Sequence, residues 1–142
     1  MSMTRKEKLA LLRGVELFSG VTARALGVIA NAAVDVSYPA GQYIVRQGQV
    51  GTGFYVVASG RVRVVRGGRV LERLGPGGFF GELSVIDQAP RAAHVIAEDP
   101  TTCLALASWD FARLMERHPK IALAVLRAVA RRLRAATDHA RH

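Results

Sequence analysis

The sequence predicts a mainly β fold, in which a core of short strands lies between helices at both ends of the chain. Two observations indicate this order. Eleven of the 14 glycines fall between Gly41 and Gly81, while the flanking segments contain few glycines and are rich in alanine and leucine. Short stretches of β-branched and apolar residues run between these glycines, and apolar residues recur at helical spacing outside them. The predicted order is therefore helices, β core, helices.

The N-terminal helical segment covers residues 4–33. Apolar residues in it, such as Leu26 and Ile29, recur every three or four positions, which places them on one face of a helix. The stretch FSGVT interrupts this pattern. Thr22 at its end suits the N-cap of a second helix, because a threonine hydroxyl accepts a hydrogen bond from a free backbone N–H of the first turn.

The β core covers residues 34–107. Its first segment, VDVSY, alternates between apolar and polar residues, as a half-buried strand does. Further runs rich in β-branched or apolar residues are QYIVRQ, FYVVAS, RVRVVR, RVLERL, AHVIAE and TTCLALA. Because the turn signals PAG, SG, GG and GPGG separate short strands, the pattern is typical of a β-sandwich, a jelly roll or a small barrel.

The C-terminal segment, residues 108–137, predicts two helices. Ser108 is the expected N-cap of the first, and Pro119 suits the first position of the second because it lacks an N–H to leave unpaired. An apolar stripe at four-residue spacing then follows: Ile121, Val125, Val129 and Leu133. Three arginines occupy a different face of this helix: Arg127, Arg131 and Arg134.

Length and composition predict one soluble domain over residues 1–142. No run approaches the ~20 apolar residues that span a bilayer, and the N-terminus lacks the apolar stretch of a signal peptide. We therefore expect a cytoplasmic protein without a membrane partner. The lone Cys103 excludes an intrachain disulfide. The net charge of +9 favours an anionic partner, although an arginine excess also arises from a GC-rich genome.

The stretch GELSVIDQAPRAAHV, residues 81–95, carries the strongest chemical signal. The glycine-rich GPGG precedes it, and GELSVI is long enough for a single helical turn. Arg91 offers a planar fork of donors suited to a phosphate, and Glu82 offers an acceptor suited to a sugar hydroxyl. The alternative is a Glu82–Arg91 salt bridge that stabilises the loop and has no role in ligand binding.

With Phe80 in front, the stretch reads FGELSVIDQAPRAAHV and resembles the phosphate-binding cassette of cyclic-nucleotide-binding domains. The run YPAGQYIVRQGQVGTGFYVVASGRVRV resembles the first β half of the same family, and the helices at 108–137 resemble its B and C helices. The resemblance implies a double-stranded β-helix, that is, a jelly-roll β-barrel with helices at both ends. It places the cassette at residues 80–95.

The resemblance also implies a role for each cassette position. Glu82 would accept the ribose 2′-hydroxyl with help from the Gly81 backbone, and Arg91 would pair with the cyclic phosphate. The backbone N–H groups of Ser84 and Ala92 would reach the same phosphate. Residues that would line an apolar pocket for sugar and base are Leu83, Val62, Val64 and Ala93.

Two further positions bear on the base. The family position that favours guanine through a hydroxyl is Ala92 here, which implies cAMP rather than cGMP. A residue of the C-terminal helix often covers the base in this family, and Arg132 is the candidate. The alternative is that Arg132 is simply a solvated helix charge, like its arginine neighbours.

The sequence therefore predicts a cyclic-nucleotide sensor that repositions its C-terminal helices, with no cofactor beyond its ligand, cAMP or else cGMP. No nucleophile or acid–base pair indicates an enzyme, and His94 is expected on a strand surface. No DNA-reading helix-turn-helix follows the last helix, so we expect a standalone domain or a fragment that acts on an unidentified effector protein or oligomer partner. Two rivals remain: an interaction module that binds no nucleotide, and a basic nucleic-acid-binding protein, which the few aromatics disfavour.

Overall fold

The computed structural model describes residues 2–51 and 53–140, without the side chains of residues 83–84 and 138–140. The helices are α1 (Arg5–Arg13), the 3-10 helix η1 (Glu16–Phe18), α2 (Ala23–Ala32), α3 (Glu82–Asp87), α4 (Ser108–Arg117) and α5 (Pro119–Ala140). The strands are β1 (Val34–Tyr38), β2 (Tyr43–Val45), β3 (Gly53–Ser59), β4 (Val62–Arg66), β5 (Arg69–Leu74), β6 (Phe79–Phe80), β7 (His94–Ala97) and β8 (Thr101–Ala107). Helices, β core and helices thus follow in the predicted order.

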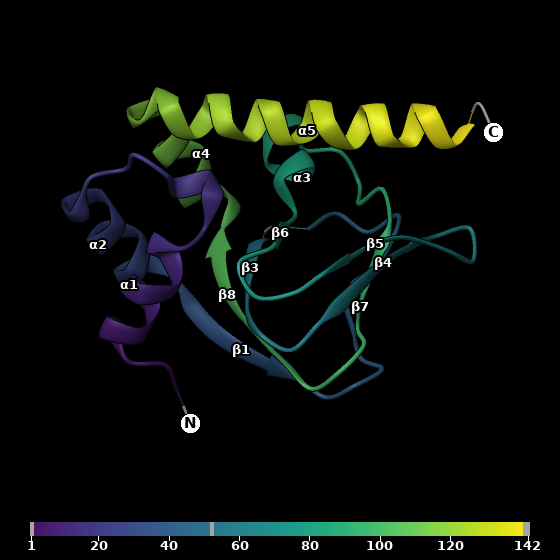
Figure 1. Ribbon diagram of the computed structural model, residues 1–142, viewed down its shortest axis with the longest axis horizontal. Coiled ribbons are helices and arrows are strands. Elements are labelled where there is room, and N and C mark those ends of the chain that lie inside the picture. Colours follow the sequence, from purple (N-terminus) through teal and green to yellow (C-terminus); the bar gives the residue numbers. More distant parts are fainter. Residues whose placement is uncertain (1, 52, 141–142) are drawn as a thin grey trace.

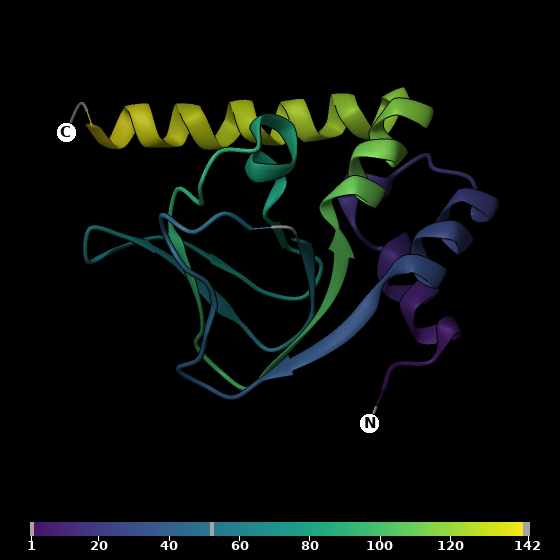
Figure 2. The same ribbon diagram turned by 180° about the vertical axis from the view of Figure 1, so that it is seen from behind.

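The strands form two antiparallel sheets. One has the order β1-β8-β3-β6 and the other the order β2-β7-β4-β5. Long helix α5 runs along one side of the molecule, with α3 beneath its middle and the N-terminal helices against β1 and β8 (Figure 1). Seen from behind, the β4–β5 hairpin lies below the C-terminal half of α5, at the opposite end from α1 and α2 (Figure 2). This arrangement is the predicted jelly roll with helices at both ends.

Strands β3 and β8 are buried on both faces, which explains why their sequences are almost continuously apolar. One face carries Phe54 and Leu104 into a core shared with the helices, where Phe54 stacks on Phe111 of α4 with ring centroids 4.0 Å apart. The other face carries Val57 and Cys103 into a second core between the sheets. The helices and the barrel are therefore packed onto the same two strands.

Several local predictions are confirmed. The Thr22 hydroxyl accepts from the Ala25 N–H at 3.2 Å and so caps α2, and Pro119 is the first residue of α5. The prediction that Ser108 is an N-cap is wrong. The N-cap of α4 is Ala107, and it provides no side-chain hydrogen bond. Strand β8 runs into α4 without a loop residue, so its last residue makes the turn and Ser108 is already helical.

The apolar stripe of α5 is only partly a core stripe. Ile121 and Val125 are fully buried, whereas Leu133 is 66% exposed. The helix continues to Ala140, and its C-terminal half extends past α4 over the β4–β5 side of the molecule (Figure 1). Among the described residues, no helix combines the length and apolar character needed to cross a membrane.

Candidate functional site

The glycine-led turn before α3 builds one half of the site. Gly81 has φ +98°, a backbone conformation that strains any residue with a side chain, and a Cβ there would lie 2.6 Å from the Gly53 carbonyl oxygen. The chain turns at this glycine and begins α3 at Glu82, as the sequence predicts. The Glu82 side chain is only 3% exposed. The turn thus directs an acceptor-only carboxylate inward from the surface.

Arg91 forms the other half of the site. It is 7% exposed, and it donates from Nη2 to the Gly53 carbonyl at 2.8 Å and from Nη1 to the Gly81 carbonyl at 3.3 Å. Its Nε is buried without a hydrogen-bond partner among the described residues. Burial lowers the pKa of Arg91, and the nearby Tyr55 and Glu82 act against that shift. A buried cation with an unused donor is a site that an anion would stabilise.

A segment that the sequence reasoning missed supports Arg91. The Gly48 N–H donates to the Arg91 carbonyl and the Arg91 N–H donates to the Gln49 carbonyl, both at 2.9 Å. Gly51 lies directly against the guanidinium, because a Cβ at this position would overlap Nε, Nη2 and Cζ of Arg91. The closely spaced glycines of GQVGTGF carry this signal, since backbone that approaches a side chain closely excludes a Cβ.

A cavity of about 370 Å³ opens beside Arg91, within the size range of small-molecule sites. Its lining includes Tyr43, Arg46 and Tyr55 besides Arg91 and Gly51. Of the residues expected to bind ligand whose side chains the structure describes, only Arg91 lines this cavity.

Glu82 and Arg91 do not form the salt bridge that was the alternative interpretation; the described side chains make no such pair. The Glu82 carboxylate accepts instead from Arg132 of α5. The charges of Glu82 and Arg91, at the two ends of the predicted cassette, therefore do not neutralise each other. Glu82 is engaged by a helix far along the chain, while Arg91 is held by backbone carbonyls.

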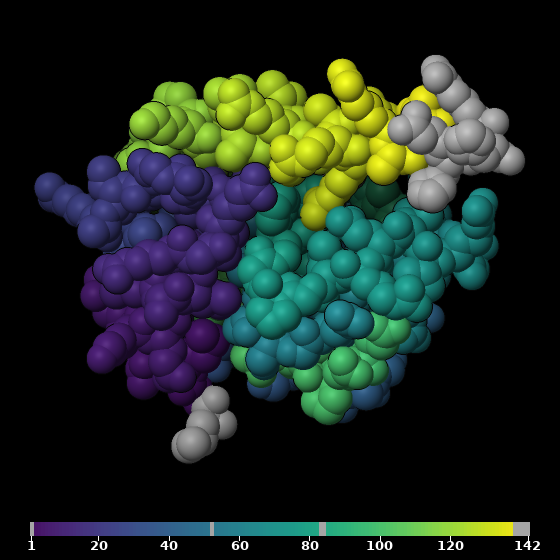
Figure 3. All heavy atoms as spheres, viewed as in Figure 1, coloured from purple at the N-terminus to yellow at the C-terminus, as the bar shows by residue number. Residues whose placement is uncertain are grey.

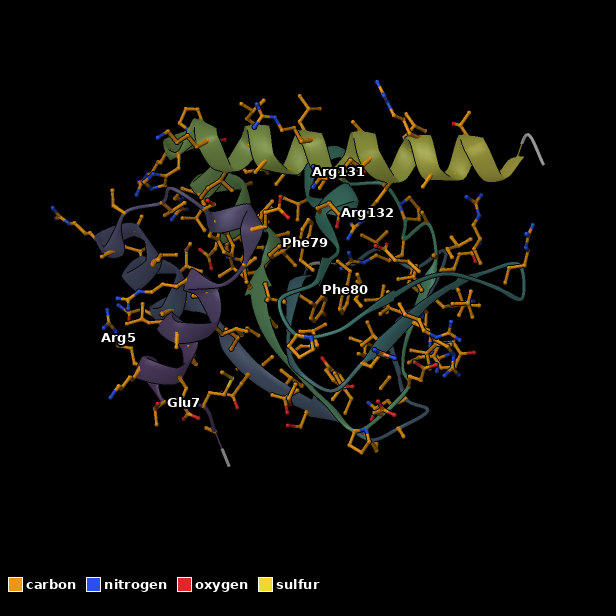
Figure 4. All side chains as sticks on the ribbon, in the orientation of Figure 1. Arg5, Glu7, Phe79, Phe80, Arg131 and Arg132 are labelled. Atoms are coloured by element: carbon orange, nitrogen blue, oxygen red, sulfur yellow. The ribbon has the colours of Figure 1, made fainter. Side chains whose placement is uncertain are left out.

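Arg132 reaches the site from the underside of α5. It also donates from Nη2 to the Phe79 carbonyl at 2.8 Å, and its Nε lies 3.5 Å from a Glu72 carboxylate oxygen on β5. Its guanidinium Cζ is 4.8 Å from the centroid of the Phe79 ring. Figure 4 shows Arg132 between α5 and Phe79. Arg132 is thus not a solvated helix charge, unlike the exposed Arg127 and Arg134.

The other predicted binding residues lie in different environments. Val62 is fully buried in the core between the sheets, and Val64 packs against the same core. Ala92 is exposed and Ala93 is partly buried. Leu83 and Ser84 belong to α3 by their backbone, but their side chains lie outside the described set. Among the described residues, no group of three or more His, Cys, Asp or Glu is placed to hold a metal ion.

The space-filling view shows how the site is covered. Helix α5 lies across the upper side of the β core (Figure 3), and α3 lies directly beneath it in the ribbon view (Figure 1). Arg132 is 30% exposed by its side chain under this cover, against 3% for Glu82. Access to Glu82 is therefore limited by Arg132 of α5.

Known proteins share this architecture. The model of the family described as "Cyclic nucleotide-binding domain" matches residues 35–118. The "Cyclic AMP receptor protein" of Thermus thermophilus is 38% identical over 130 residues, which are 88% of this chain and 60% of that protein. The crystal structure of Thermus thermophilus catabolite activator protein superposes with a TM-score of 0.78 at 38% identity, over 87% of this chain and 60% of that one.

A second solved structure is the regulatory domain of Toxoplasma gondii PKA with cAMP, at a TM-score of 0.80 and 31% identity. The match covers 89% of this chain and 50% of that one. The chain therefore spans less than two thirds of the length of these relatives. Sequence and structure agree over the β core and its flanking helices, and the chain belongs to the family of cyclic nucleotide-binding domains.

Proposed function

We propose that the chain binds a cyclic nucleotide, with cAMP favoured over cGMP, and acts as a regulatory domain and not as an enzyme. The observation that carries this proposal is Arg91. It is a buried guanidinium with an unpartnered Nε among the described residues, packed against Gly51 and fixed by two carbonyls. A cyclic phosphate supplies the negative charge and the acceptor oxygens that such a group lacks.

The remaining cassette groups would complete the contact. The ribose 2′-hydroxyl would donate to the carboxylate of Glu82, which follows the turn at Gly81, and the Gly81 backbone would assist. Backbone N–H groups of Ser84 and Ala92 would add donors to the phosphate. Leu83, Ala93 and Val64 would provide apolar surface toward sugar and base, and Val62, which is fully buried in the core between the sheets, would lie behind them. The support for these roles is the match of residues 35–118 to the family together with the positions of Glu82 and Arg91.

The Glu82–Arg132 contact gives the site a physical link to α5. A ribose hydroxyl that approaches Glu82 must either share this carboxylate with the Arg132 guanidinium or displace the guanidinium from it. The position of α5 would then depend on the ligand, because the same guanidinium also binds the Phe79 carbonyl and Glu72. We infer that binding shifts α5 between positions with Arg132 as the coupling residue, and that Arg132 covers the base in the bound form.

Base preference in this proposal rests on Ala92. A threonine or serine here would offer a hydroxyl to the guanine base, and alanine offers none. The exposed position of Ala92 leaves room for a larger side chain. The output would pass to an effector protein or to an oligomer partner, since the relatives include a receptor, an activator and a kinase regulatory domain.

The test is calorimetric titration of the purified chain with cAMP and with cGMP. Saturable cAMP binding that is stronger than cGMP binding supports the proposal. Arg91→Ala should weaken cAMP binding by roughly 2–5 kcal/mol, because the phosphate then enters a buried site without its cation. Arg24→Ala, at an exposed arginine of α2 far along the chain from the cassette, is the matched control and should bind as the parent does. Absence of cAMP and cGMP binding would refute the proposal.

A further inference from the structure

His94 lies beside the segment that supports Arg91. It is the first residue of β7 and follows Arg91 by three positions. Its Nδ1 accepts a hydrogen bond from the Gln47 backbone N–H at 3.0 Å. Its ring stands edge-on to Tyr43, with the ring centroids 5.2 Å apart. The half-buried side chain lies at the strand surface, as the sequence predicts, and makes a specific contact there.

The contact fixes the segment that supports Arg91. Gln47 binds His94, Gly48 and Gln49 exchange backbone hydrogen bonds with Arg91, and Gly51 lies against the guanidinium. Residues 47–51 thus form a short cradle, one end of which is tied to β7 by the His94 ring. Loss of the His94 contact would free that end of the cradle, and the guanidinium would lose part of its support.

The state of the imidazole decides whether the contact exists. Nδ1 can accept only while it carries no proton, and in the cationic ring both nitrogens are donors. Protonation would place an N–H donor against the Gln47 N–H. A cation lies on the same aromatic neighbour, since Arg46 packs over the Tyr43 ring that His94 also contacts, with its Cζ 4.3 Å from the centroid.

The remaining neighbours of His94 are also cationic or neutral. On β4 its partner in the ladder is Val65, which stands between Val64 and Arg66, with Arg63 two ladder positions away. Among the described residues, no carboxylate lies within ion-pair distance of His94. A proton on His94 would therefore gain no acidic partner to offset the broken hydrogen bond.

We propose that His94 is a positioning residue for Arg91: its neutral imidazole holds the 47–51 cradle against β7, and protonation releases the cradle and weakens binding of the anionic ligand. This inference rests on the proposed function, because it concerns the affinity of the same site. Histidine is the side chain whose charge ordinarily changes between about pH 5 and 8. The ligand phosphodiester stays ionised over this range, so it does not itself produce the effect.

The binding test compares cAMP dissociation constants at pH 7.5 and pH 5.5 for the parent chain, His94→Asn and His94→Leu. The parent should bind cAMP roughly two- to tenfold more weakly at the lower pH, because that is the change in affinity that the loss of one hydrogen bond produces. The amide oxygen introduced by His94→Asn can accept from the Gln47 N–H and does not titrate, so this variant should show less than a twofold change. His94→Leu should be weak at both pH values. A parent with no pH dependence, or the same dependence in His94→Asn, would overturn the proposal.

A second measurement separates this proposal from failure of the proposed function. In the ligand-free chain, the amide signal of Gln47 should titrate in nuclear magnetic resonance spectra together with the ring protons of His94. The same amide should not titrate in His94→Asn. If no nucleotide binds but the coupled titration appears, the function is wrong and the cradle contact is right. If cAMP binds and Gln47 does not follow His94, the positioning role is refuted.

Discussion

The substitution Gly51→Ala tests the support of Arg91 most directly. The backbone of Gly51 lies outside the left-handed region, so alanine adopts it without strain, but its Cβ would overlap the Arg91 guanidinium. The guanidinium must then move away and give up its hydrogen bonds to the Gly53 and Gly81 carbonyls, at 2.8 Å and 3.3 Å. The perturbation therefore removes the geometry of the site without removing the charge.

Its magnitude follows from these contacts. Two hydrogen bonds from a charged donor contribute about 3 kcal/mol at the low end of their range. Replacement of glycine by alanine restores up to about 1 kcal/mol, because it reduces the conformational freedom of the unfolded chain. We expect a net loss of about 2 kcal/mol in the free energy of unfolding. Binding of cAMP should weaken by about 30-fold or more, if a similar free energy is lost at the phosphate.

The assays are urea unfolding monitored by circular dichroism, and calorimetric titration with cAMP. Gly75→Ala is the matched control, since a Cβ at Gly75 meets nothing within 4 Å and its φ is also outside the left-handed region. The control should change neither stability nor affinity appreciably. If Gly51→Ala unfolds and binds like Gly75→Ala, the guanidinium does not rest on the Gly51 backbone and the reasoning is refuted.

Three further predictions concern other parts of the chain. Arg132→Met should destabilise the fold by about 2 kcal/mol, because it leaves the buried Glu82 carboxylate unpaired, and Glu82→Gln should recover part of that loss; additive effects in a double-mutant cycle by urea unfolding would contradict the contact. Ala92→Thr should raise the affinity for cGMP relative to cAMP about fivefold in calorimetric titration, the worth of one hydrogen bond, and an unchanged ratio would remove Ala92 as the basis of selectivity. Cys103 is buried and burial raises its pKa to about 12, so a thiol reagent at a pH of about 8 should modify it only as the chain unfolds; rapid modification of the native protein would contradict its burial.

Sequence patterns predicted those parts of the fold that depend on local chemistry. The strand at residues 34–38, the Thr22 cap and the start of α5 at Pro119 follow from rules that act over a few residues. The alternation of β1 was a wrong guide to its burial, because Val34 is 61% and Val36 is 36% exposed. The turn into α3 was predictable for the same reason, because glycine readily adopts the positive φ that this turn requires. The error at Ser108 arose because the last residue of β8, Ala107, already takes the N-cap position, so that Ser108 is the first helical residue.

Long-range contacts were beyond such patterns. The alternatives for Arg132 could not be decided from its helical spacing, since its partners Glu82, Phe79 and Glu72 come from segments at least 50 residues away and only the fold brings them together. The support of Arg91 by Gly51 has the same character. In the sequence, Gly51 indicates only a turn. That it has no room for a Cβ follows from the Arg91 side chain packed against it, which only the structure shows.

The chain passes from one sheet to the other at the site. Phe80 ends β6 in the first sheet, and His94 begins β7 in the second. Glu82 and Arg91 both lie on this crossing, and the carbonyl that Arg91 binds at Gly53 belongs to the first sheet. A ligand held there would therefore contact residues that join the two sheets of the barrel. Because it binds only the folded chain, it would raise the free energy of unfolding by about 2.7 kcal/mol at a ligand concentration about a hundred times the Kd.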